Sequence, residues 1–380
     1  MELWKRTLYV CLFGAFMASV GLSQAAPLIP LYLQDLGVHD QGALANWSGL
    51  AMGVTYLMVA LVSPFWGKLA DRKGRKLILL RASFGMMVTN ALLGFAQTPE
   101  HVVIIRILNG MVSGFFSGSI TLVATQTPES RTGWALGLLS AANLGGSLLG
   151  PMIGGYMGST FGIRYAFFVV SALLGITFLS SLLFIKEDFT PKIKGPAPSL
   201  KALQKSISDW KGLIFVSIAS FIFAFTTMAS APILSVFVQH IVGRGHEHIA
   251  LLAGLAFTST GIAQMLASSI LGRYIDKLGP RFILWTSFIY VGCMTIPQAF
   301  TDSIIILCII RFLLGFGLGG LLPGINTYIA NITPKHLAGQ IFAYNQSTLF
   351  FGYFMGAVGG SAIVSQWGFN LYVSGEFENE

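Results

Sequence analysis

Charged side chains are scarce in this sequence, and acidic ones are the scarcest. Lys, Arg, Asp and Glu together make up 10% of the 380 residues, against about 25% in an average soluble domain. Hydrophobic residues make up 54%, and all 15 acidic residues fall in predicted loops, chain ends or the ends of apolar runs. This composition excludes a large soluble domain and predicts an integral membrane protein.

Patterns for disulfide, nucleotide and metal binding are also missing. Cys11, Cys293 and Cys308 lie inside apolar runs without the spacing of metal ligands. No G-x-x-x-x-G-K-[ST] loop is present, which argues against ATP-driven transport by this chain alone. The His-Glu-His run at residues 246–248 lacks a further ligand at fixed spacing. We therefore expect no enzyme activity, no cofactor and no metal.

Eleven apolar runs are long enough to cross a membrane, which takes about twenty residues each. Helices in an antiparallel bundle pair every backbone amide inside the lipid. The sequence therefore predicts an all-α polytopic membrane protein, with spans at about 8–33, 45–66, 77–96, 102–125, 134–158, 165–185, 213–238, 249–271, 282–300, 304–329 and 339–363.

One long polar stretch divides the chain into two parts. We expect an N-terminal bundle at 1–185 with spans one to six, a cytoplasmic linker at 186–212, and a C-terminal bundle at 213–369 with spans seven to eleven. The tail at 370–380 carries three glutamates in its last five residues, and each acid is costly at the bilayer centre. The twelfth span of a duplicated plan is therefore expected to be missing.

The basic residues indicate orientation rather than a nucleic-acid partner. The net charge is +8, and in this topology all Lys and Arg residues lie in cytoplasmic segments except Arg106, Arg164, Arg244 and Arg311. Cytoplasmic loops carry the excess of cations. The N-terminus is therefore predicted to be cytoplasmic, and we expect a monomer in the lipid bilayer of the bacterial inner membrane.

The chain also contains an internal repeat at an offset of 205 to 206 residues. Arg106, Gly110 and Gly114 recur as Arg311, Gly315 and Gly319, and the glycines at 146, 150 and 154 recur at 352, 356 and 360. Repeats in parallel order imply two similar bundles related by an axis along the membrane normal.

Three motifs carry a resemblance to a known family. Residues 67–76, Gly-Lys-Leu-Ala-Asp-Arg-Lys-Gly-Arg-Lys, resemble the loop signature G-x-x-x-D-R-x-G-R-K of the major facilitator superfamily. The glycines of the fifth span with Pro151 resemble the motif of its drug–proton antiporters, and the runs 63–67, 133–137 and 311–315 are similar to its multidrug efflux branch. The resemblance extends to about Phe369. It implies a secondary transporter of the major facilitator fold, which exports small lipophilic compounds in exchange for protons by alternating access.

The resemblance assigns a conformational switch to the loop after the second span. In the family its carboxylate, here Asp71, bonds the start of the eleventh span, here near residues 338–340, and favours the outward-open state. Cations that only fix the topology are the alternative interpretation for the neighbouring lysines. The switch residues implied are Gly67, Asp71, Arg72, Gly74 and Arg75, with Asp276 in the weaker second copy.

The resemblance assigns the antiporter motif to the fifth span, where a bend seals the cavity against ion leak. Close helix packing, which small residues favour anywhere in a membrane, is the alternative. The second copy has Ala357 in place of the proline, so only the first copy carries the bend. The residues of this motif are Gly146, Gly150, Pro151, Gly154 and Gly155.

Proton coupling is implied for Arg106, an ionisable residue inside a span. Snorkelling of its side chain to the surface is the alternative. Asp35, at the outer end of the first span, is the only nearby carboxylate that could pair with it. The identity of the proton carrier stays open at this point.

Substrate is expected near the bilayer midplane between the halves, in a mostly apolar cavity. Each polar candidate has an alternative role in a hydrogen bond between helices. The candidates are Gln24, Asn109, Asn143, Thr226, Gln264, Asn326, Tyr344 and Gln346. Two further functions stay open, namely a proton-coupled uptake symporter for a sugar or metabolite, and a truncated member that no longer transports.

Overall fold

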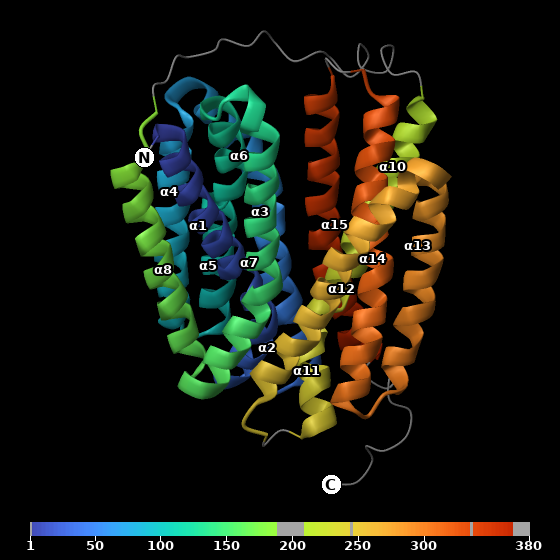
Figure 1. Ribbon diagram of the computed structural model, residues 1–380. Helices are drawn as coiled ribbons and strands as arrows, with labels where there is room; N and C mark the ends of the chain where they lie inside the picture. Colours follow the sequence, from blue (N-terminus) through green and yellow to red (C-terminus); the bar gives the residue numbers. More distant parts are fainter. Residues whose placement is uncertain (1, 188–208, 244–245, 335–336, 368–380) are drawn as a thin grey trace, which may run out of the picture.

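The computed structural model describes residues 2–187, 209–243, 246–334 and 337–367. Regular structure in these ranges is entirely helical and forms two bundles side by side (Figure 1). The first half contains α1 (Leu3–Ser23), α2 (Ala25–Asp35), α3 (Gln41–Lys73), α4 (Arg75–Gly94), α5 (Pro99–Val112), α6 (Phe115–Gln126), η1 (Glu129–Arg131), α7 (Thr132–Phe161) and α8 (Ile163–Phe184). The second contains α10 (Trp210–Ala229), α11 (Ala231–Val242), α12 (Ile249–Leu278), α13 (Pro280–Thr295), η2 (Ile296–Phe300), α14 (Ile304–Ile332) and α15 (Ala338–Trp367).

The eleven predicted spans are confirmed, because eleven helical segments of the described chain are long and apolar enough to cross a membrane. Three of the spans consist of two helices each, namely α1 with α2, α5 with α6, and α10 with α11. The first and seventh spans break at Gln24 and Ser230, which are 206 residues apart, so this break belongs to the repeated plan. The position expected for a twelfth span, the tail at 370–380 and most of the linker fall outside the described residues.

Single glycines join consecutive helices at the turns that the repeat predicts. Gly74 lies between α3 and α4 with φ +93°, and Gly279 lies between α12 and α13 with φ +83°. Glycine adopts a positive φ without steric cost. These two turns place α4 and α13 antiparallel to the helix before them, as the duplicated loop requires.

In each half, small residues let the fifth span of that half pack closely on its first span, namely α7 on α1 and α15 on α10. A Cβ atom at Gly146 of α7 would overlap the carbonyl oxygen of Phe16 in α1. A Cβ at Gly356 of α15 would likewise overlap the carbonyl oxygen of Phe225 in α10. Close backbone approach of this kind stabilises helix pairs in lipid, where apolar burial contributes little.

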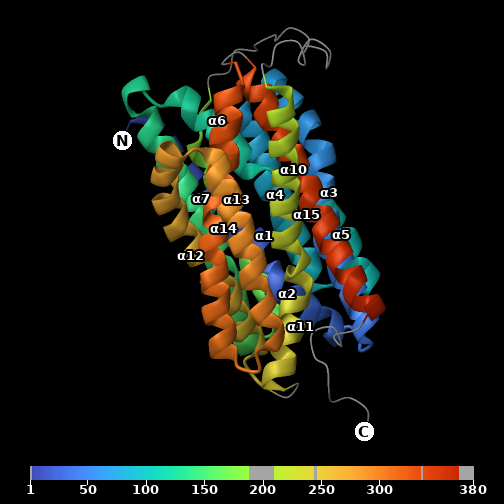
Figure 2. The ribbon, with the colours of Figure 1, turned by 90° about the vertical axis from the view of Figure 1, so that its right-hand side faces the viewer.

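The bundle has two distinct ends. We call the end that carries Leu3, Gly74, Glu187 and Asp209 the linker end, and the opposite end, with Asp35 and the last residues of α11, the far end. The helices of the two halves are spread apart at the linker end in Figure 1 and converge at the far end. In Figure 2, α2 and α11 lie together at the far end, where they are in contact.

Candidate functional site

A cavity of about 1360 Å³ lies between the two halves. Helices of both halves line it, and its wall extends to Gly67, Asp71 and Thr121 near the linker end. Most of the wall is apolar. Its aromatic members are Tyr56, Trp66, Phe115, Phe116, Phe223, Phe225, Phe237, Phe257, Phe350 and Tyr353. A large apolar cavity with few polar groups suits a lipophilic ligand.

The charged side chains of the cavity wall are mostly cationic. Arg75, Arg81, Arg106 and Arg311 line the cavity, whereas Asp71 is the only acidic residue among the described lining residues. Arg106 and Arg311 are only 3% and 6% exposed. Arg106 donates from Nε to the carbonyl oxygen of Ala51 at 3.3 Å. Within the described chain neither arginine pairs with a carboxylate, so both carry an uncompensated positive charge into the cavity.

Half of the predicted substrate residues lie in the cavity wall. Asn143 and Thr226 line it, as do Gln264 and Gln346. Asn143 accepts a hydrogen bond from Ser19 Oγ at 2.6 Å, which joins α7 to α1.

The other four predicted substrate residues are not among the residues that line this cavity. Gln24 donates to Asn90 at 3.4 Å and Asn109 donates to Thr89 Oγ1 at 2.7 Å, so both join helices within the first half. Tyr344 accepts from Gln340 one turn earlier on α15. Asn326 is exposed on α14. The alternative of a hydrogen bond between helices therefore holds for Gln24 and Asn109.

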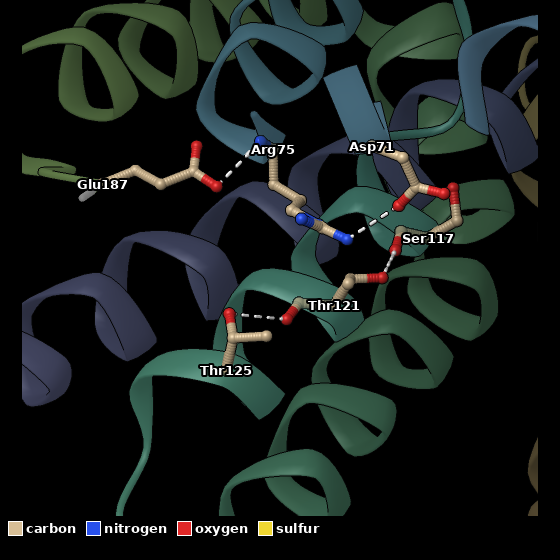
Figure 3. Close-up of polar contacts among 6 residues, drawn as sticks. All are labelled: Asp71, Arg75, Ser117, Thr121, Thr125 and Glu187. Carbon is tan, nitrogen blue, oxygen red and sulfur yellow. Dashed lines mark hydrogen bonds and ion pairs between the residues drawn. The ribbon is translucent and has the colours of Figure 1, made fainter. Parts of the chain in front are cut away.

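The predicted switch loop lies beside the cavity at the linker end (Figure 3). Arg75 Nη2 donates to Asp71 Oδ1 at 2.9 Å, with side-chain exposures of 14% and 30%. Arg72 is exposed in the last turn of α3, and a Cβ at Gly67 would meet open space. The structure thus brings Asp71 and Arg75 together.

Two predicted parts of the switch cannot be placed in detail. Asp276 belongs to α12, but its side chain lies outside the described part of the structure. The same applies to the side chains at positions 338 and 339 of α15, where Asp71 was predicted to bond.

Glu187 is a further member of this loop that sequence reasoning missed. It lies three residues after α8, and its two carboxylate oxygens accept the backbone N–H groups of Arg75 at 2.9 Å and Lys76 at 2.7 Å. Figure 3 shows Glu187 next to the start of α4. The sequence signal was an acid directly after a span, adjacent to the basic linker.

The break in the fourth span was also missed. Ser113 and Gly114 separate α5 from α6, and Gly114 has φ +120°. Trp66 Nε1 donates to the carbonyl oxygen of Met111 at 2.8 Å, and Arg81 Nη1 donates to the same oxygen at 3.2 Å. The Arg81 guanidinium lies 3.7 Å from the centre of the Trp66 ring.

The corresponding tenth span is one continuous helix, α14. At the repeat offset, Leu271 and Ser287 replace the tryptophan and the arginine that bind the free carbonyl groups of the first copy. The side chains that bind the free carbonyl groups at this break are therefore present in the first copy only.

The fifth-span motif contacts both halves. A Cβ at Gly150 would overlap Ser23 Oγ, and one at Gly154 would lie 2.7 Å from Gln24 Cβ, both in the first span. Gly155 faces the other way, and a Cβ there would overlap the carbonyl oxygen of Ala250 in α12. Pro151 lies inside α7 and lines the cavity. The motif therefore forms part of the contact between the halves.

The far end is held by a pair of glutamines. Gln34 Nε2 donates to Gln239 Oε1 at 2.8 Å, and Gln239 Nε2 donates to Gln34 Oε1 at 3.0 Å. Nearby, Ser235 Oγ donates to the carbonyl oxygen of Pro27 at 3.0 Å. The two glutamines are 205 residues apart and thus repeat-related, a signal in the sequence that was overlooked.

The predicted pairing of Asp35 with Arg106 is not found. Asp35 ends α2 at the far end, and its charged neighbour is Arg164 at the start of α8, whereas Arg106 lies in the cavity wall. Partial burial raises the pKa of Asp35, and the positive charge of Arg164 opposes this shift. Asp35 is not among the described residues that line the cavity.

Comparisons with known proteins agree with this architecture. The model of the Major Facilitator Superfamily matches residues 11–242 and 216–374. Multidrug resistance protein MdtG of Escherichia coli strain K12 / DH10B is 37% identical over 366 residues, which are 96% of this chain and 90% of that protein. The same figures hold for MdtG of Escherichia coli strain SMS-3-5 / SECEC.

Two solved structures share the fold. A bacterial homologue of the human lysosomal transporter Spinster, in an inward-facing and occupied conformation, has a TM-score of 0.78 at 14% identity and covers 96% of this chain and 83% of its own. Its inward-facing, unoccupied form has a TM-score of 0.74 at 14% identity and covers 94% and 82%. The predicted two-bundle helical fold is thereby confirmed.

Proposed function

The chain belongs to the major facilitator superfamily and is a membrane transporter, and we propose that it exports small lipophilic compounds in exchange for protons by alternating access. The observation that supports this best is the large apolar cavity, which both halves line and whose helices are spread apart at the linker end (Figure 1). Alternating access needs a cavity between two halves that opens to one side of the membrane and then, after the halves move, to the other. The 37% identity to a multidrug resistance protein supports export.

We propose that the linker end faces the cytoplasm. Basic residues gather there, in the last turns of α3 and α12 and the first turns of α4 and α13. Cytoplasmic segments carry the excess of Lys and Arg. With this orientation the cavity is accessible from the cytoplasm, which is the side from which an exporter takes up its substrate.

The cavity charges favour lipophilic compounds that carry a negative charge. Arg106 and Arg311 are buried without a carboxylate partner in the described chain. An uncompensated charge in a low-dielectric wall attracts a counter-ion much more strongly than one in water. The aromatic residues of the wall accommodate the apolar body of such a ligand, while the two guanidinium groups bind its anionic group.

The proposal that export is coupled to protons is supported by the fifth-span motif and by the membership of the chain in the major facilitator superfamily. Arg106 is the coupling residue that we propose, because it is buried in the cavity wall at the position implied by the family resemblance. Asp35, the carboxylate that the sequence suggests as its partner, has Arg164 as its charged neighbour in this structure. Asp71 is the one carboxylate among the described lining residues, and it accepts a hydrogen bond from Arg75.

Two ions of the same shape and opposite charge test the ligand preference. Tetraphenylborate and tetraphenylphosphonium are titrated against the purified protein, with tryptophan fluorescence as the readout, since Trp66 lines the cavity. We expect saturable binding of the anion, at least tenfold tighter than that of the cation, and loss of this preference in Arg311→Gln. Equal binding of both ions, or tighter binding of the cation, would refute the preference for anions.

Transport itself is measured with an anionic dye, anilinonaphthalene sulfonate, in inside-out membrane vesicles with an acidified interior. We expect uptake that depends on the protein and disappears with a proton uncoupler. Uptake that persists after the pH gradient is collapsed would contradict proton exchange. Movement of the dye together with protons, out of the vesicles, would instead indicate a symporter.

A further inference from the structure

The first end of the linker is fastened to the switch loop. Besides the two bonds of Glu187 to the start of α4, Lys76 Nζ donates to the carbonyl oxygen of Leu182 at 2.9 Å. Gln126 Nε2 at the end of α6 donates to the carbonyl oxygen of Lys186 at 2.8 Å. The first residues of the linker are thus held by two helices other than α8, namely α4 and α6.

Helix α4 lacks a cap of its own. Its N-cap residue is Gly74, which has no side chain to accept a hydrogen bond from the first turn. The first N–H groups of a helix need an acceptor, and the helix dipole favours an anion at this position. The glycine is required by the positive φ of the turn, so the capping group has to come from elsewhere, and Glu187 supplies it.

The second end of the linker makes a related contact in the other half. Asp209 caps α10 by accepting the N–H of Gly212 at 2.8 Å, and it also accepts from the Tyr328 hydroxyl at 3.2 Å. Its other partner is Arg281, at 3.6 Å. Arg281 is the second residue of α13 and lies 206 positions after Arg75. The carboxylates at the two linker ends therefore reach repeat-related starts of helices.

We propose that the ends of the linker take part in the switch, and that Glu187 positions Arg75 so that its guanidinium bonds Asp71. Glu187 fixes the backbone N–H of Arg75, and the guanidinium of that same residue holds Asp71. Without Glu187 the first turn of α4 loses its acceptor, and Arg75 is no longer directed toward Asp71. Glu187 is thus a positioning residue that acts through Asp71.

A double-mutant cycle tests this chain of contacts without any substrate. Spin labels replace Thr125 on α6 and Ala343 on α15, both exposed, in full-length protein whose three native cysteines are changed to alanine. The distance between the labels reports how far the linker end is open. The variants are Glu187→Ala, Asp71→Asn and the combination of the two. Because the readout is conformational, a failure of the transport proposal leaves this test intact.

We expect Glu187→Ala to lower the ratio of closed to open linker ends about three- to tenfold, in the same direction as Asp71→Asn. In the Asp71→Asn background, Glu187→Ala should add less than about twofold, because Glu187 acts through Asp71. Glu187→Gln keeps the volume and one acceptor oxygen, and we expect an intermediate ratio. It also provides the readout should the alanine variant fail to fold.

Glu129 is the matched control. It is an exposed acid at the same end, on η1, and its side chain has no hydrogen bond to the described residues. Glu129→Ala should leave the ratio unchanged. Additive effects of the Glu187 and Asp71 changes would overturn the proposal, as would an unchanged ratio in folded Glu187→Ala or an equal shift in Glu129→Ala.

Discussion

At the far end, the two halves touch each other through neutral groups, whereas at the linker end charged groups bond partners in their own half. Gln34 and Gln239 exchange two hydrogen bonds across the interface. At the linker end, Arg75 bonds Asp71 within the first half, and Asp209 bonds Tyr328 within the second. The far end is therefore closed by direct contact between the halves, whereas these two linker-end bonds each join groups of one half.

In the transport cycle that we propose, this difference gives the two ends of the cavity contacts of unlike kind. Hydrogen bonds between neutral amide groups and close contacts at glycine are short-range, and they are lost as soon as the helices separate. A carboxylate near a helix end acts over a longer distance and depends on charge. Alternating access then requires that the contacts of the far end break when the charged groups of the linker end meet.

The largest effect is expected where the far end depends on close packing. Gly155→Leu places a bulky side chain against the carbonyl oxygen of Ala250, so α7 and α12 cannot approach. Overpacking of this kind costs about 1–3 kcal/mol. We expect export to fall at least tenfold at equal membrane abundance. The control Gly292→Leu, at an exposed glycine of α13 with open space around it, should export normally, and equal loss in both variants would contradict the packing argument.

Next in size is the switch at the linker end. Asp71→Asn removes the charge that Arg75 holds, and an anion at a helix end contributes up to about 2 kcal/mol. We expect export to fall about three- to thirtyfold while the amount of folded protein stays the same. Glu129→Gln serves as the control for loss of one acid at this end. Wild-type export by Asp71→Asn would exclude a switch role.

The glutamine pair should give a smaller effect with a distinctive pattern. Gln34→Leu leaves the amide of Gln239 without its partner, and an unpaired polar group costs about 1–3 kcal/mol when buried. Both glutamines are half-buried, so we expect a shift of about fivefold or less toward an open far end. The double variant Gln34→Leu/Gln239→Leu should shift less than either single variant, and a larger shift in the double variant would speak against the pair.

Asp35 should have the smallest effect of all. Its raised pKa means that the folded protein binds this proton more tightly than the unfolded chain does. Its contribution to stability is therefore greatest below the ordinary pKa of an aspartate and falls as the pH rises through the raised value. Asp35→Asn should gain thermal stability over the wild type at pH 7 but not at pH 4.

Export by Asp35→Asn should stay within about twofold of the wild type, as for most surface substitutions. Loss of proton-driven export in this variant would return Asp35 to the coupling mechanism, despite its position next to Arg164.

The spans and their repeat could be predicted from the sequence, because hydropathy and glycine spacing are local patterns. The pairing of Asp71 with Arg75 was also within reach, since the two residues are only four positions apart in the sequence. The glutamine pair was not predicted, because an amide at the end of a span is compatible with many partners. Only the offset of 205 residues between Gln34 and Gln239 would have indicated it.

The other differences between expectation and structure have the same physical origin. Gln24 and Asn109 were expected in the cavity, but polar residues inside a span also bond the neighbouring helix, and helix rotation decides between the two outcomes. Glu187 was missed because its partner is a backbone N–H group, which every residue possesses. The carbonyl group of Met111, next to the break at Gly114, is bound by Trp66 and Arg81, which are distant in sequence.

The most direct test of the two-gate account measures both ends in the same preparation. One label pair replaces Thr125 and Ala343 at the linker end, and a second pair replaces Thr160 and Asp302 at the far end, all on exposed positions. The account predicts that Gln34→Leu lengthens the far-end distance and shortens the linker-end distance, and that Asp71→Asn does the reverse. Distances that lengthen together at both ends, or a far end that never opens under any condition, would contradict it.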